Sequence, residues 1–390
     1  MASNISQPRF KSQSGGLESL DNLPDSTSPS LQLSHPTENE TTRICNQTSN
    51  DWRDALTDSQ YLEESAYLLT VPLARNSGIT QWILVDQSQP ADKRTVLASC
   101  ETFLKRALIR DAYGESEEVI AHGIASVYCE SRLRKRGYAS RLLKELSKTL
   151  PTWRADTGTK CVASILYSDI DPIFYQRLGW NPFPSYHLEF EANAVATPSA
   201  TPLYVEDLAV LCEKDAGRLR SSISKGSTVG KTRFAIIPDH DHIAWHHSKE
   251  EFGGQKLFGK TPLVKGAIAG TPGNRVWAVW VHRFYRHPER DSSANILYIL
   301  RFVMEGDAPT AKDVRAVLQA AQTEAAEWGL ANIKLWSPPK ALEELIEAAE
   351  VSFRGRTRMQ ESIPCLQWYE QGDGLPSSLD WVLNEKYAWC

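Results

Sequence analysis

The sequence lacks paired cysteines, long apolar runs and an N-terminal apolar segment. Its seven cysteines are scattered over 390 residues, with none in a C-x-x-C pair. This argues against a disulfide framework or a cysteine-rich zinc site, and indicates reduced thiols. No apolar stretch is long enough to span a bilayer, and nothing resembles a signal peptide. We therefore expect a cytoplasmic protein that does not enter a membrane.

The sequence also lacks a large excess of charge of either sign. Lysine and arginine total 43, aspartate and glutamate total 48, and the formal net charge is -5. Such a balance gives no global attraction to nucleic acid, so we expect no nucleic-acid partner. Any anion-binding site must be local. Apolar residues make up 41% of the chain, enough for sizeable cores in one to three domains.

The N-terminal 43 residues are poor in aromatic residues and rich in Ser, Pro, Asn and Thr. A segment of this composition buries too little apolar surface to offset the entropy lost on ordering. We therefore predict a disordered tail over residues 1–43.

Residues 44–192 have the mixed pattern of a first domain. Gly123 marks a possible bulge, and the strand at 95–110 either contains a bulge or turns helical near its end. The helix at 139–150 has one apolar face and stops before Pro151. The expected order is strands at 80–86, 95–110 and 118–129, a helix at 139–150, a strand at 160–168, a short helix at 171–180 and a strand at 185–191.

A linker at 193–202 separates this domain from a second one over residues 203–390. Thr310 and Gly329 are the expected N-cap and C′ residues of its central helix. Because both segments share an order of elements, we predict an α/β (α+β) fold of tandem mixed sheets. The expected elements are a helix at 204–223, strands at 233–239, 275–286 and 295–305, a helix at 310–329, a strand at 332–338, a helix at 341–349 and a strand at 365–370.

A cationic loop precedes the helix of the first domain. Arg132, Arg134, Lys135 and Arg136 crowd the helix start, where the helix dipole disfavours positive charge. A bound phosphate group would reverse that penalty, because the first helical N–H groups point outward without partners. Gly137 would let the backbone approach such a ligand closely.

Two motifs here resemble the GNAT superfamily of N-acetyltransferases. "RKRGYA" (134–139) fits the R-x-x-G-x-G/A pattern of that superfamily, and "FYQRLGW" (174–180) resembles its F-Y-x-x-x-G-F/W element. At Glu130 and Ser131 many members carry proline, so the loop entry departs from the pattern. The whole chain, with "LYSDI" (166–170) and "NEKYAWC" (384–390), is similar to fungal L-lysine N6-acetyltransferases.

The resemblance implies acetyl-coenzyme A as cosubstrate, without a metal. A backbone N–H of Val127 or Cys129 is placed to bond the thioester carbonyl, and Tyr175 matches the family's tyrosine that protonates the departing thiolate. The general base stays open between Glu130 and the C-terminal carboxylate of Cys390. The expected cofactor-binding residues are Val127, Cys129, Arg134, Lys135, Arg136, Gly137, Tyr138, Ala139 and Ser140.

The second domain lacks the loop motif. Its corresponding junction, 305–314, carries Asp307 and Asp313, so we expect a degenerate acetyltransferase-like domain that binds no coenzyme A and shapes the acceptor pocket. The histidine run at 240–247 is predicted to be strand and loop. We expect it to line the acceptor pocket and not to bind metal.

Three functions fit this pattern. The first is acetylation of a small-molecule amine, with free L-lysine in lysine degradation as the acceptor. The second is protein lysine (histone-type) N-acetylation. The third is non-catalytic acyl-coenzyme A binding, against which the loop and Tyr175 argue.

Overall fold

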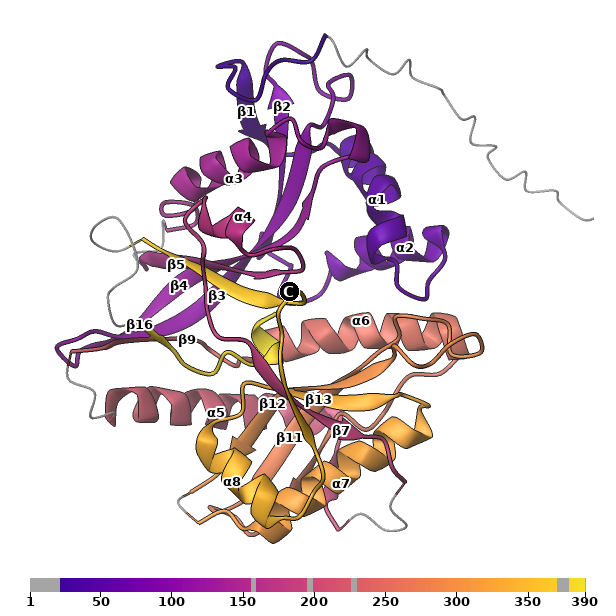
Figure 1. Cartoon of the computed structure of the whole chain (residues 1–390), viewed down its shortest axis with the longest axis vertical. Coiled ribbons are helices and arrows are strands. Elements are labelled where there is room, and N and C mark those ends of the chain that lie inside the picture. Colours follow the sequence, from indigo (N-terminus) through magenta and orange to yellow (C-terminus); the bar gives the residue numbers. More distant parts are fainter. Residues whose placement is uncertain are drawn as a thin grey trace, which may run out of the picture.

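The computed structural model describes residues 22–155, 159–194, 199–225, 230–306, 308–369 and 379–389. Two mixed sheets form an upper and a lower body, and helix α6 (His240–Phe258) lies between them (Figure 1). On one side α6 contacts α2 (Asp58–Leu68), and on the other it contacts β11 (Val276–Arg283).

The first sheet has nine strands in the described residues. Its main path runs β1-β2-β3-β4-β5-β15-β6; β9 pairs with β3, and β16 pairs with β9. The strands are β1 (Leu31–Ser34), β2 (Ile79–Asp86), β3 (Ala98–Arg110), β4 (Ser116–Tyr128), β5 (Cys161–Ser168), β6 (Asn181–Pro182), β9 (Thr232–Ile236), β15 (Ile363–Trp368) and β16 (Leu379–Trp381).

The second sheet has seven strands in the described part of the chain, in the order β14-β7-β13-β12-β11-β10-β8. Only the pairing of β12 with β13 is parallel. Besides β11, its strands are β7 (Tyr186–Glu191), β8 (Thr201–Leu203), β10 (Gly266–Ala269), β12 (Ile296–Met304), β13 (Asn332–Trp336) and β14 (Arg354–Thr357).

Helix α7 (Ala311–Glu327) has both of the ends that the sequence predicts. In α7 the Thr310 side chain accepts a hydrogen bond from the Asp313 N–H, and Gly329 has a φ of +62° just after the C-cap, so both predicted ends are confirmed. Besides α2 and α6, the helices are α1 (Glu38–Trp52), α3 (Tyr138–Thr149), α4 (Ile173–Gln176), α5 (Val205–Lys225), α7 (Ala311–Glu327) and α8 (Lys340–Ala348).

The two halves of the chain exchange strands. The strand expected to close the first domain forms as β7, but it lies in the second sheet between β14 and β13. In return β15, from the C-terminal half, pairs with β5 and β6 of the first sheet. One apolar cluster joins the two sheets, with Val162 and Ile165 on one side and Trp277 and Val279 on the other. The halves therefore share a core.

The predicted disordered tail is wrong from residue 22 onward, while residues 1–21 lie outside the described part. β1 buries Leu31, which is 3% exposed, and α1 begins with a capping box between Thr37 and Glu40. Glu40 is fully buried and pairs with Arg94 at 2.9 Å. Composition alone misses this ordering because the partner that stabilises the segment lies far along the chain.

The histidine run is a helix, not the predicted strand and loop. Asp239 caps α6 by accepting hydrogen bonds from the N–H and the Nδ1 of His242. Pro238 lies just outside the helix, so it does not interrupt it. The described residues contain no group of three or more His, Cys, Asp or Glu side chains that could hold a metal ion.

Candidate active site

Strands β4 and β5 separate in the middle of the first sheet. Their parallel pairing runs from Ile120↔Cys161 to Ile124↔Leu166. Beyond that point β4 continues to Tyr128 along β3, whereas β5 continues to Ser168 along β15. In the described residues the edge of β4 that faces β5 has no strand partner after Ile124. Its backbone groups are therefore open to an extended ligand.

A bulge in β4 adjusts the end of this strand. Glu101 pairs with Ala125, but Ser99 pairs with Tyr128, and Ser126 has a φ of +54°. The bulge is thus at Ser126, not at Gly123 as the sequence suggested, because glycine is only one route to a bulge. β3 itself stays a strand to Arg110, so its predicted alternative helical end does not form.

The start of α3 is an uncapped helix N-terminus. Gly137 is its N-cap, with a φ of +86° and no side-chain cap. In the described part of the chain, no acceptor takes a hydrogen bond from the N–H groups of residues 135–140. By contrast, α7 is capped by its own Thr310. Only the first of these two helix starts therefore keeps this set of donors for an anion.

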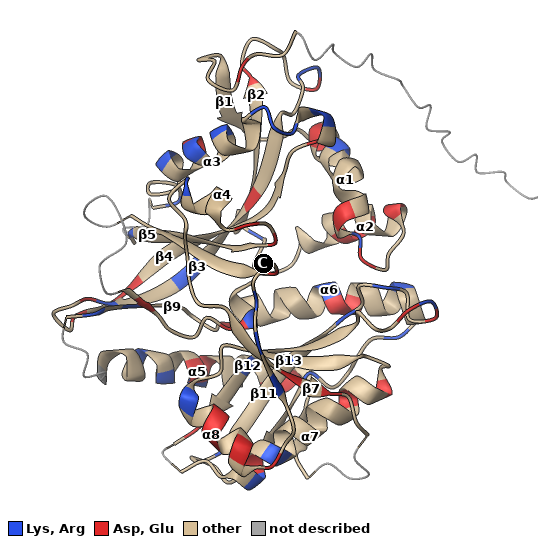
Figure 2. Cartoon of the chain, in the orientation of Figure 1, with Lys and Arg blue, Asp and Glu red and all other residues tan. Residues whose placement is uncertain are grey.

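The loop cations divide into two kinds. Arg132 pairs with Glu130 at 2.7 Å, and Arg134 bonds the carbonyl oxygen of Cys129 at 2.9 Å. Lys135 and Arg136 have no ion pair within the described residues. Figure 2 shows further lysines and arginines along α3. Lys135 and Arg136 are thus the loop side chains best able to meet a phosphate.

The segment before β1 packs on this helix start, which the sequence did not predict. Tyr138 Oη donates to the Pro24 carbonyl at 2.7 Å, and Arg141 donates to the Ser26 carbonyl at 2.9 Å. A Cβ at Gly137 would lie 2.6 Å from Ser26 Oγ. Residues 22–28 therefore form one wall beside the cationic loop at 132–137. Their polar composition gave no sign of this role.

Tyr175 lies on α4 and is 8% exposed. It belongs to the apolar cluster that also contains Cys100, Tyr138 and Cys365, against which Val127 and Cys129 pack. Burial raises the pKa of Tyr175 above its ordinary value. The phenol is therefore protonated at neutral pH, as a proton donor must be.

The structure describes only one of the two predicted base candidates. Glu130 follows β4, but its carboxylate bonds Arg132 and accepts from Gln47 Nε2 of α1 at 3.4 Å. Cys390, whose carboxylate is the other candidate, lies outside the described residues. Its neighbour Trp389 is described, and it lines a pocket between the two bodies.

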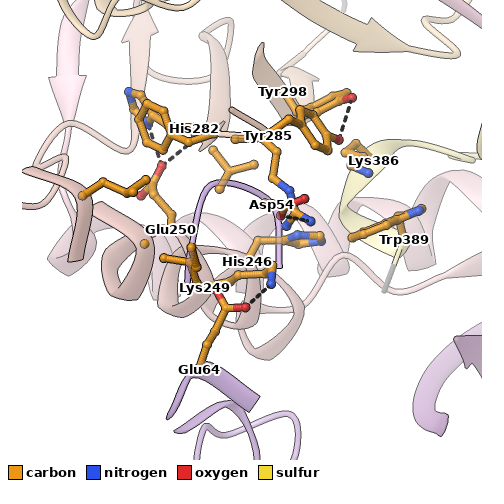
Figure 3. Close-up of a pocket in the computed structure, with 16 residues that line it drawn as sticks. Asp54, Glu64, His246, Lys249, Glu250, His282, Tyr285, Tyr298, Lys386 and Trp389 are labelled. Carbon is orange, nitrogen blue, oxygen red and sulfur yellow. Dashed lines mark hydrogen bonds and ion pairs between the residues drawn. The ribbon is translucent and has the colours of Figure 1, made fainter. Parts of the chain in front are cut away.

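A pocket lies between the two bodies (Figure 3). α2 and the turn before it form one wall, while α6, β11, β12 and the C-terminal segment form the rest. The lining residues are Asp54, Leu56, Glu64, His246, Lys249, Glu250, Gly253, Leu257, Val281, His282, Arg283, Phe284, Tyr285, Tyr298, Lys386 and Trp389.

Two ion pairs cross this pocket from the first body to the second. Asp54 contacts Arg283 at 2.6 Å, and Glu64 contacts Lys249 at 2.5 Å. Asp54 has a φ of +53°, an uncommon conformation for a residue other than glycine. Burial lowers the pKa of His246 well below its ordinary value, so this histidine is neutral at physiological pH.

The pocket adjoins the separated strands. Trp389 packs on an apolar cluster that contains Phe103 and Trp245, and Ala125 of β4 packs on the same cluster. Arg283 lies over the Trp389 ring at 5.9 Å. The pocket therefore begins beside the open end of β4 and extends to Asp54 and Arg283. Neither of these two residues carries a local sequence signal, since one ends a buried strand and the other lies in a helix–helix turn.

These features define a class of protein. Two parallel strands separate beside an uncapped, glycine-initiated helix start, and together they leave backbone groups free for an extended, anionic ligand. A pocket lined by both bodies adjoins them. No helix in the described part of the chain is long and apolar enough to cross a membrane.

The family follows from residues 187–390, which match the model described as the LYC1 GNAT-like C-terminal domain. The match covers more than half of the chain, so the chain belongs to this family of GNAT acetyltransferases. It is an acyl-coenzyme A-dependent N-acetyltransferase.

Similar proteins were found by sequence and by structure. The lysine acetyltransferase of Yarrowia lipolytica is 23% identical over 352 residues, covering 76% of this chain and 85% of that protein. A GCN5-related N-acetyltransferase from Anabaena variabilis has a TM-score of 0.47 and 12% identity, covering 86% of this chain and 72% of its own. A probable N-acyltransferase from Enterococcus faecalis has a TM-score of 0.47 and 13% identity. The match covers 87% of this chain and 73% of the Enterococcus chain.

Proposed function

We propose that this enzyme transfers the acetyl group of acetyl-coenzyme A to the side-chain amine of free L-lysine. The pyrophosphate binds the N–H groups of residues 135–140, with Lys135 and Arg136 beside it. The pantetheine chain enters between β4 and β5 and bonds the free edge near Val127 and Cys129. Tyr175 protonates the coenzyme A thiolate as it leaves.

The observation that carries the choice of acceptor is the Asp54–Arg283 pair in the pocket. Free lysine carries an α-ammonium and an α-carboxylate on the same carbon atom, and a paired carboxylate and guanidinium match both charges. Their side chains are 18% and 19% exposed, so the pair is largely withdrawn from solvent. Arg283 Nε also has no hydrogen-bond partner in the described residues. A carboxylate ligand would supply one.

The shape of the pocket supports a small acceptor. Both bodies contribute walls, and Trp389 lies between the charge pair and the cluster that contains Ala125 of β4. A lysine whose α-groups bind Asp54 and Arg283 would direct its flexible chain past Trp389 toward the thioester. A lysine within a peptide has amides in place of both α-charges, so the buried pair would stay unmatched.

The name of the Yarrowia lipolytica relative, a lysine acetyltransferase, supports lysine as the acceptor. The proposed reaction consumes free lysine and would serve lysine degradation in the cytoplasm. The charge pair favours the free amino acid over the protein-bound lysine of a histone-type enzyme.

The test is thiol release from acetyl-coenzyme A with a panel of matched amines. We expect turnover with L-lysine, and much less with cadaverine, which lacks the carboxylate, or with Nα-acetyl-lysine amide, which lacks both α-charges. Equal rates on free lysine and on a histone-tail peptide would replace the small-molecule proposal with protein acetylation. Coenzyme A binding without turnover on any amine would indicate a binding protein.

A further inference from the structure

Glu101, which no sequence motif marked, lies at the bulge where β4 and β5 separate. It faces Ala125 across the β3–β4 ladder, directly before the bulged Ser126. Ser126 Oγ donates to one oxygen of its carboxylate at 3.0 Å, and Gln81 Nε2 donates to the other at 3.2 Å. Two neutral donors therefore hold the carboxylate in place without neutralising its charge.

The side of the sheet on which Glu101 lies follows from strand alternation. Glu101 and Phe103 share one face of β3, and Cys100 lies on the other. Phe103 belongs to the cluster with Trp389, which lines the pocket, whereas Cys100 belongs to the cluster beneath α3. Glu101 is thus on the acceptor side of the sheet, at the level of the strand opening.

The groups facing Glu101 from the packed elements carry no positive charge. They are Cys45 of α1 and Tyr61 of α2, besides Gln81 and Ser126. On the same face of β3, the buried Lys105 lies beyond Phe103, with its Nζ over the Phe103 ring at 5.6 Å. Burial raises the pKa of Tyr61 to about 12, and the negative charge of Glu101 adds to this rise. Both Cys45 and Tyr61 are therefore neutral at physiological pH. No described cation pairs with Glu101, in contrast to Glu130, which pairs with Arg132.

We propose that Glu101 is the general base of the transfer. It takes one proton from the acceptor ammonium, directly or through a water molecule, and passes it to solvent. The amine nitrogen then forms the bond to the thioester carbonyl carbon, and the C–S bond breaks. The second proton lost by nitrogen ends on the coenzyme A thiol. This assignment rests on the proposed cofactor site at the strand opening, but it holds for any amine acceptor.

The experiment compares Glu101→Gln with Glu130→Gln as a matched control. Loss of a general base typically costs about 10²- to 10⁴-fold in rate. We expect Glu101→Gln to lower kcat on this scale at neutral pH, with unchanged coenzyme A affinity by calorimetry and an unchanged melting temperature. Its remaining activity should rise with pH, because solvent then deprotonates an amine of pKa about 10.4. Glu101→Asp should recover part of the rate.

Two results would overturn the assignment. One is a Glu101→Gln enzyme with the rate and pH profile of the unmodified enzyme. The other is a comparable loss in Glu130→Gln alone, which would return the role to that residue. If the unmodified enzyme acetylates a different amine but not lysine, the acceptor proposal fails, and the Glu101 comparison is carried out with that amine.

Discussion

Gly137 and Ser26 lie side by side at the start of α3, although they are far apart in the sequence. A Cβ on residue 137 would lie 2.6 Å from Ser26 Oγ, and the φ of Gly137 is +86°. Glycine is therefore required twice, once by the backbone conformation and once by the neighbouring segment. In the proposed function, the same glycine leaves space for the pyrophosphate.

Gly137→Ala should weaken acetyl-coenzyme A binding. The left-handed conformation costs a residue with a Cβ about 1–2 kcal/mol, and relief of this strain would move the loop N–H groups. We expect roughly a tenfold or greater loss of affinity by calorimetry. Ser26→Gly removes the contact alone and should leave the affinity near its normal value. The double variant should still bind acetyl-coenzyme A weakly, because the φ of residue 137 is still strained. If the double variant recovers full affinity, the clash with Ser26 was the whole cause of the loss.

Tyr175→Phe should keep cofactor binding and lower turnover. The phenol is buried and protonated, and its loss removes only the donor oxygen from an otherwise intact apolar cluster. We expect a decrease in kcat of about 10²- to 10⁴-fold with little change in the Kd of coenzyme A. A normal rate would show that Tyr175 only packs and that water protonates the thiolate.

Arg283→Met should raise the KM for lysine far more than the KM for acetyl-coenzyme A. Removing one partner of a buried ion pair costs about 3–5 kcal/mol because the other charge is left unpaired, so stability must be measured as well. Asp54→Asn combined with Arg283→Met removes both charges and serves as the control for folding. In the double variant, cadaverine should become as good a substrate as lysine. Retained preference for lysine would mean that other residues bind its α-groups.

The C-terminal segment should make stability depend on pH. Arg301 lies between Asp215, at 2.7 Å, and Glu385, so a single cation serves two buried carboxylates. Burial raises the pKa of Glu385 to about 7. Between about pH 4.5 and 7 the folded state therefore binds more protons than the unfolded state, and the free energy of unfolding decreases as pH rises.

Over that pH range the Glu385 contribution amounts to about 3 kcal/mol. Glu385→Gln should remove this part of the pH dependence in urea unfolding measured at several pH values. If the variant and the unmodified protein show parallel pH profiles, Glu385 is ionised throughout in the folded protein.

Local features of the sequence predicted several helix boundaries, including the glycine-initiated start of α3. Each of these signals affects the conformation of only a few neighbouring residues. They are the stripe of leucines before Pro151, the cap at Thr310 and the glycine after the cationic run. Their conformational preferences are the same in any fold that accepts them, so they could be recognised without the structure. The motif around Gly137 also carried the resemblance that the family match bears out.

Only the tertiary structure decided which distant segments pair with one another. The exchange of β7 and β15, the ordering of Glu40 by Arg94 and the bulge at Ser126 depend on which strand or charge lies alongside. Asp54 and Arg283 likewise become a pair only when the two bodies meet. Sequence by itself determined the local helix start that suits a phosphate. The pocket between the two bodies required the fold, because its charges come from distant segments that no periodicity or spacing relates to one another.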